Sequence, residues 1–120
     1  DILGTSMYRQ TWNEKWGWFN YPLPPAYYYI KAKFIKLFYP VKNIINSELQ
    51  VEPWATNNDL SKMSRFDQMY AMDLDQVKAN LSFARKAGLV ENYLWGIEWW
   101  YWLGETQTDW SFWEFGKTIK

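Results

Sequence analysis

Short apolar runs alternate with amphipathic helical patterns along this chain, and that alternation limits the folds open to it. Runs rich in β-branched and aromatic residues predict strands at 2–7, 43–48 and 92–98. Apolar residues spaced three and four apart predict helices at 26–38 and 74–87, and a last short helix at 110–118. The expected order is therefore strand, helix, repeated three times.

This order predicts an α/β protein in which parallel strands are joined by helical crossovers. Long segments follow the predicted strands and short connections precede them, which is typical of a TIM (β/α)8 barrel with its site at the C-terminal strand ends. A doubly wound sheet predicts the same alternation, but Gly4 stands alone in the first strand and no glycine-rich phosphate loop follows it. We therefore expect residues 1–120 to be the C-terminal portion of a single barrel domain, comprising its last three βα units.

Helix-boundary signals support the two longer helices. Pro25 suits a first helical turn, and the expected buried face of that helix consists of Tyr27, Ile30, Phe34, Leu37 and Phe38. For the next helix, Asp73 followed by Gln76 resembles a capping box, and Gly88 is the expected C-terminal stop.

Composition excludes several functional classes. The chain has no histidine and no cysteine, and its 13 basic and 13 acidic residues are not clustered into a basic face. We therefore predict no metal site, no cofactor and no nucleic-acid partner. The longest apolar run, "YLWGIEWWYWL", is interrupted by Glu98 and is shorter than the roughly 18 residues that span a bilayer, so no membrane-spanning segment is expected.

Aromatic residues and strand-end carboxylates favour carbohydrate chemistry. The 10 Trp and 9 Tyr residues combine flat apolar faces with polar edges, which suits sites for sugars. Glu48, Glu52 and Glu98 lie at or just beyond predicted strand ends. Without imidazole or thiol groups, paired carboxylates are the leading catalytic groups, and glycoside hydrolysis is the reaction class that most often uses two of them.

Three motifs, in order, resemble the last strands of the clan A retaining glycoside hydrolases. "DILGTSMYR" resembles the sixth strand of that clan, which often ends in a tyrosine near the nucleophile. "KNIINSELQ" is similar to its seventh strand, where an apolar run and Ser or Thr precede the nucleophilic Glu. "NYLWGIEWWYW" resembles its eighth strand, which supplies a tryptophan to the sugar site, and "ELQVEPW" with "YLWGIEWWYW" is also similar to bacterial barrel proteins of cellulase-like type.

The resemblance implies a retaining glycoside hydrolase that acts on a β-linked poly- or oligosaccharide. In that reading Glu48 is the nucleophile, Tyr8 orients it by a hydrogen bond, and either Trp95 or Trp99 forms the sugar platform. Further substrate contacts are expected from Arg9, Gln50, Glu52, Trp54 and Glu98. Trp12, Trp16 and Trp18 follow the first strand and would lie on the same side of a barrel.

The chain departs from the clan pattern because the acid/base glutamate of that clan ends the fourth strand, and no such strand is present in these residues. The acid/base and the remainder of the barrel are therefore expected before Asp1, and the fragment alone is expected to be inactive. Two alternatives stay open: a non-catalytic carbohydrate-binding barrel, and a protein-interaction module that uses a Trp-rich rim.

Overall fold

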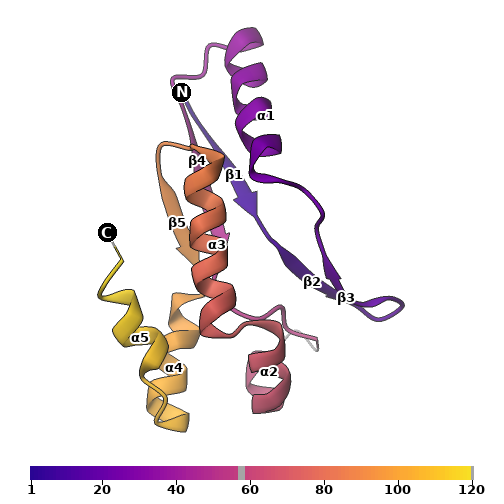
Figure 1. Cartoon of the computed structure of the whole chain (residues 1–120), viewed down its shortest axis with the longest axis vertical. Coiled ribbons are helices and arrows are strands. Elements are labelled where there is room, and N and C mark those ends of the chain that lie inside the picture. The colour runs from indigo at the N-terminus through magenta and orange to yellow at the C-terminus, as the bar shows by residue number, and fades with distance from the viewer. Residues whose placement is uncertain (57–58, 120) are drawn as a thin grey trace.

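The computed structural model describes residues 1–56 and 59–119. They form a three-stranded sheet, a separate two-stranded sheet and the helices that connect and follow the strands (Figure 1). The strands are β1 (Ile2–Met7), β2 (Gln10–Asn13), β3 (Gly17–Asn20), β4 (Asn43–Gln50) and β5 (Asn92–Trp95). The helices are α1 (Pro25–Phe38), α2 (Arg65–Ala71), α3 (Leu74–Ala87), α4 (Ile97–Gln107) and α5 (Ser111–Gly116), with a short 3-10 turn η1 (Leu60–Lys62) before α2.

The main sheet has three parallel strands in the order β1-β4-β5, so its spatial order follows the chain. Helix α1 connects β1 to β4, whereas α2 and α3 connect β4 to β5. Because parallel crossovers are right-handed, a sheet that grows in one direction receives its helices on one face. Helices α1 and α3 pack together on that face, and α3 lies in front of β4 in Figure 1.

We call the opposite side of the main sheet the open face. Side chains that alternate away from the helices are exposed there, including Ile2 at 63%, Tyr93 at 52% and Trp95 at 46%. The α/β class and the parallel sheet are thus confirmed. The three strands form an open sheet that is not closed into a barrel.

The core lies between the other face of the sheet and the helices that follow β4 and β5. Leu49 and Val51 from β4 and its end pack with Trp100 and Phe112, all of them buried. The Trp100 indole donates a hydrogen bond to the Val51 carbonyl at 2.8 Å, which fixes α4 against the end of β4. The tryptophan-rich segment after β5 therefore serves largely to build the core.

The first strand and the two longer helices lie where the sequence predicts them. Asp73 accepts a hydrogen bond from the Gln76 backbone N–H at 2.7 Å, and Gly88 ends α3 at φ 67°. Strand β4 extends to Gln50, beyond the expected end at 48. Strand β5 is shorter than expected, because Gly96 turns the chain at φ 98° and α4 begins directly after it.

Two further expectations were wrong. The Trp-rich segment after β1, expected to be a loop, contains the antiparallel β2–β3 hairpin, in which Trp12 pairs with Trp18. The second error concerns α1, which packs through Tyr28 on Phe83 of α3, with ring centroids 5.9 Å apart. The face expected to be buried is instead exposed, and we call its most exposed members the α1 outer stripe: Ile30, Phe34, Leu37 and Phe38.

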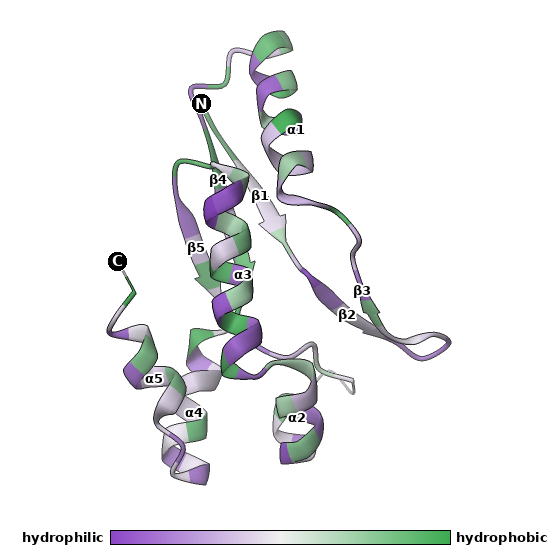
Figure 2. Cartoon of the chain, in the orientation of Figure 1, coloured by the Kyte–Doolittle hydropathy of each residue, from purple (hydrophilic) through white to green (hydrophobic). Residues whose placement is uncertain are grey.

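Apolar and hydrophilic residues alternate along the whole of α1 in Figure 2, so its sequence allows more than one apolar face. The packing of α1 against α3, rather than its periodicity, decides which of these faces is partly covered. None of the helices described in the structure is long and apolar enough to cross a membrane.

Candidate functional site

A β-bulge in β4 directs acidic side chains onto the open face. Thr5 pairs with Asn46, but the next residue, Ser6, pairs with Glu48, so β4 contains one residue more than β1 over this stretch. The extra residue is Ser47, whose hydroxyl lies on the open face next to Gly4. A bulge of this kind changes the phase of the pleat. Beyond it, Leu49 points into the core whereas Glu48 points to the open face.

Glu48 is held by two hydroxyl groups from β1 and its end. Ser6 Oγ donates to Glu48 Oε2 at 3.0 Å, and Tyr8 Oη donates to the same oxygen at 2.8 Å. Burial, the hydrogen bond to Glu48 and the Glu48 charge all raise the pKa of Tyr8, so its hydroxyl remains a donor throughout the neutral range. The hydrogen bond expected between Tyr8 and Glu48 is therefore present, and Ser6 adds a second one.

A pocket of about 200 Å³ lies beside Tyr8 at the C-terminal end of the sheet. We call it the strand-end pocket; its lining includes Tyr8, Gln50, Glu52, Trp54 and Trp95. Trp54 meets Tyr8 edge to face, with ring centroids 5.6 Å apart. Trp54 and Trp95 keep 39% and 46% of their surface exposed, so both present aromatic surface to a ligand.

Glu52 is a half-buried acid in this pocket. Burial and, to a smaller extent, the nearby Glu98 carboxylate raise the pKa of Glu52 to about 7, against the lowering effect of a hydrogen bond from Trp95. Gly96 lies directly against the side chain, and a Cβ at this position would overlap the Glu52 side chain. Gly96 is therefore needed both for its left-handed backbone and for the space that Glu52 occupies.

Gln50 supports the pocket wall through its fully buried amide. Its Oε1 accepts hydrogen bonds from the backbone N–H groups of Arg9 and Gln10, each at 3.0 Å. Its Nε2 donates to the carbonyls of Gln10 at 2.9 Å and Glu52 at 3.3 Å. Because its polar atoms are all engaged, Gln50 acts as a brace between the ends of β1 and β4 and leaves the Tyr8 and Glu52 side chains to meet a ligand.

Three of the expected substrate contacts do not line the strand-end pocket. Trp99 is 3% exposed and donates to Gln68 Oε1 at 3.0 Å, so it belongs to the core, whereas Trp95 remains 46% exposed. The Arg9 guanidinium stacks on Phe83 of α3 at 4.0 Å and thus points to the helix side. Glu98 lies in the first turn of α4 and not at a strand end, although its charge still reaches Glu52.

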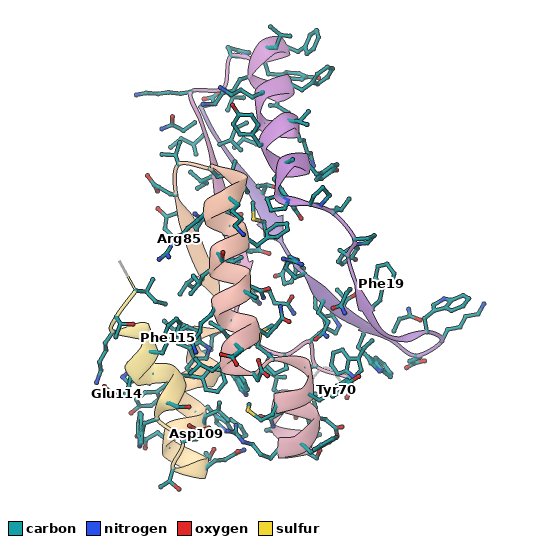
Figure 3. All side chains as sticks on the ribbon, viewed as in Figure 1. Phe19, Tyr70, Arg85, Asp109, Glu114 and Phe115 are labelled. Carbon is teal, nitrogen blue, oxygen red and sulfur yellow. The ribbon has the colours of Figure 1, made fainter. Side chains whose placement is uncertain are left out.

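The β2–β3 hairpin places further aromatic surface at the same end of the sheet. It extends to the lower right in Figure 1, beyond the C-terminal end of β1, and Phe19 projects from it in Figure 3. Trp16, in the turn between β2 and β3, is 75% exposed. The hairpin is an extension of the strand-end surface and not the irregular loop expected from the sequence.

Ser6 and Gly96 are the site residues that the sequence reading missed. Strand alternation places Ser6 on the same face as Tyr8, and this signal was available. The role of Gly96 depends on the side chain of Glu52, which belongs to another segment, so the sequence around Gly96 does not indicate this role. Among the described residues, no group of three or more carboxylates is close enough to hold a metal ion.

Comparison of the chain with known protein families, curated proteins and solved structures finds no match. The functional interpretation therefore depends on the geometry of the open face and the strand-end pocket.

Proposed function

We propose that this chain contributes the last three βα units and the nucleophile of a retaining glycoside hydrolase with a (β/α)8 barrel, which acts on a β-linked poly- or oligosaccharide. The observation that carries the proposal is the pair of hydrogen bonds from Ser6 and Tyr8 to one oxygen of Glu48, beside a pocket flanked by Trp54 and Trp95. A nucleophilic carboxylate must be ionised and held in a fixed direction, and hydroxyl donors provide both.

In this mechanism Glu48 attacks the anomeric carbon while the bond from that carbon to the leaving oxygen breaks. A second carboxylic acid protonates the leaving oxygen, and then, as a carboxylate, it takes a proton from the water that hydrolyses the glycosyl ester. In a retaining enzyme that group lies about 5 to 5.5 Å from the nucleophile. We propose that it comes from a part of the barrel outside these residues.

The sheet supports the barrel proposal in two ways. Its strand order has no reversal and its helices lie on one face, as in a barrel wall. Its open face bears both polar side chains such as Glu48 and exposed apolar ones such as Ile2, and closure of a barrel would cover that face. Further parallel strands would also pair with the free edges of β1 and β5.

The direct test replaces Glu48 in the complete protein. Glu48→Gln keeps the shape of the side chain but removes the nucleophile, so we expect turnover of activated aryl β-glycosides to fall to background. Glu48→Gly with external azide should restore release of the aryl group and yield a glycosyl azide. Glu105→Gln, an exposed glutamate of α4, is the matched control and should leave turnover unchanged.

Unchanged turnover in Glu48→Gln would overturn the assignment, and loss of turnover only in Glu52→Gln would transfer the nucleophile to Glu52. A non-catalytic carbohydrate-binding barrel is the second candidate, favoured by a pocket whose aromatic walls need no nucleophile. Glycan binding without turnover, in a protein that lacks a carboxylic acid at the end of a fourth strand, would favour that function. A stoichiometric protein partner without glycan binding would favour an interaction module that uses the hairpin, where Trp16 is exposed.

A further inference from the structure

Acids gather around the strand-end pocket, and none of the lysines and arginines described in the structure pairs with them. Glu52 lines the pocket, Glu48 lies across Tyr8 from it, and Glu98 acts on Glu52 from α4. In the described part of the chain, no lysine or arginine lines the pocket and no ion pair involves these three glutamates.

The nearby cations are committed to other contacts. Arg9, the closest to the site in sequence, stacks on Phe83, and Arg65 forms an ion pair with Asp109. Arg85 projects from α3, far from the hairpin in Figure 3. A ligand that enters the pocket therefore meets carboxyl groups, hydroxyl groups and indole rings.

The side chain of Glu52 is fixed by its surroundings. Gly96 leaves room for it, the Trp95 indole hydrogen-bonds to it, and Gln50 holds its backbone carbonyl. The titratable groups that face it are Glu98 from α4 and Tyr8 from the end of β1, whose hydroxyl is bonded to Glu48. Burial and the Glu98 carboxylate both disfavour a negative charge on Glu52, so the pKa of Glu52 rises to about 7.

We infer that Glu52 keeps its proton when a ligand binds and donates a hydrogen bond to a sugar hydroxyl, so that the pocket selects neutral sugars over uronic acids. This inference rests on the proposed carbohydrate function and names the substrate class for it. No proton is transferred, since Glu52 remains a donor in the complex. A uronate would instead bring a further carboxylate next to Glu52, Glu48 and Glu98.

The protonation state of Glu52 determines how the affinity for a neutral sugar changes with pH. Below about pH 7 Glu52 is protonated and can donate, so a neutral ligand binds well. Above it, Glu52 loses the donor proton and gains a charge that a neutral sugar does not compensate. Loss of one neutral hydrogen bond corresponds to roughly 2- to 10-fold weaker binding as the pH rises.

The test uses the complete protein carrying Glu48→Gln, which prevents turnover during the measurement. An array of neutral β-linked oligosaccharides and their uronic-acid counterparts identifies the strongest neutral ligand. Calorimetry then measures its Kd at about pH 5.5 and about pH 8.5, which lie roughly equally far below and above the raised pKa of Glu52 and both exceed the ordinary pKa of a glutamate. We expect weaker binding at the higher pH and at least about tenfold weaker binding of the uronate form at both.

Two further variants isolate Glu52. Glu52→Gln keeps a permanent donor, so its Kd should not change with pH. Glu98→Gln removes a carboxylate that raises the pKa of Glu52, so Glu52 should ionise at a lower pH and the transition in Kd should move to lower pH. Glu105→Gln should reproduce the unsubstituted profile.

A wild-type pH profile in Glu52→Gln, equal binding of the uronate, or no binding of any neutral glycan would each overturn the inference. The proposed nucleophile fails separately, because residual turnover in Glu48→Gln contradicts the role of Glu48 while leaving the Glu52 profile intact.

Discussion

At the scale of single residues, the Tyr8 hydroxyl distinguishes Glu48 from the other exposed acids of the chain. Tyr8, at the end of β1, donates this hydrogen bond to Glu48 on the neighbouring strand β4. The chemically similar pair of Tyr93 and Glu91 is instead formed by residues two apart in the sequence, on an exposed edge. A contact between distant segments constrains the direction of a side chain more tightly than a local one does. Removing the hydroxyl from each tyrosine in turn therefore compares the same chemical change at the candidate site and away from it.

Tyr8→Phe removes the hydroxyl but keeps the ring that contacts Trp54. If Tyr8 orients a nucleophile, the loss of one hydrogen bond to a charged group, about 1.5 to 3 kcal/mol, should lower kcat roughly 10- to 100-fold. Because the substrate contacts remain, KM should change little. Steady-state kinetics on an aryl β-glycoside measures both, and Tyr93→Phe is the control that should leave them unchanged. Equal effects of the two substitutions would remove the orienting role of Tyr8.

At the scale of elements, the junction of β5 and α4 couples a backbone turn to the position of an acid. Gly96 has φ 98° and lies against Glu52, while Gly17, at the hairpin, has φ 70° with open space around it. Both positions disfavour a side chain through the backbone, but only Gly96 adds a steric conflict. Substitutions at Gly17 and Gly96 therefore separate the backbone cost of a left-handed residue from the steric cost of an added Cβ.

Gly17→Ala should destabilise the fold by about 1 to 2 kcal/mol, which is the cost of a left-handed alanine. Gly96→Ala should cost about 1 to 3 kcal/mol more, because the added methyl displaces the Glu52 side chain. Urea unfolding followed by tryptophan fluorescence measures the difference as a shift in midpoint. Equal midpoints for the two variants would mean that Glu52 moves away freely and that Gly96 does not fix it.

The elements were predictable from the sequence where one pattern dominated. The first strand and α3 have clear periodicity and strong boundary residues, so their bounds agree closely with the structure. The strand predicted at 92–98 ran into the first turn of α4, because a short apolar run such as "GIEWWYWL" fits either element. The hairpin was missed because its tryptophans, its asparagines and Gly17 resemble a loop, and its pairing is not recorded in a clear alternation.

The site was predictable to the extent that strand ends determine it. Glu48 and Tyr8 meet because parallel strands bring their C-terminal ends to one edge, and the sequence order is enough to expect this. The inward position of Trp99 and the stacking of Arg9 on Phe83 depend on how the helices pack on the sheet. No local pattern records such contacts.

At the scale of the whole molecule, apolar surface remains uncovered on two sides of the sheet. The α1 outer stripe is one of them, with Leu37 at 76% and Ile30 at 63% exposure, and the open face is the other. Contiguous apolar surface of this kind promotes association. The free edges of β1 and β5 add unpaired backbone groups to it.

We expect the 120-residue chain, produced by itself, to self-associate through these surfaces. Ile30→Lys with Leu37→Lys should reduce the mean mass in sedimentation velocity without loss of helical circular dichroism, because both side chains are already exposed. Ala79→Lys with Ser82→Lys adds the same charge to exposed positions of α3 and is the matched control. If both pairs reduce association equally, net charge and not the α1 outer stripe is responsible.

Ser47 is the residue of β4 that has no counterpart in the paired stretch of β1. Because Asn46 pairs with Thr5 and Glu48 pairs with Ser6, a chain without Ser47 would keep both pairs in a regular ladder. Glu48 would stay on the open face and Leu49 in the core, since simple alternation from Asn46 gives them the sides they occupy now. The bulge thus lets this strand carry an additional residue at position 47 without changing which residues build the core and which form the site.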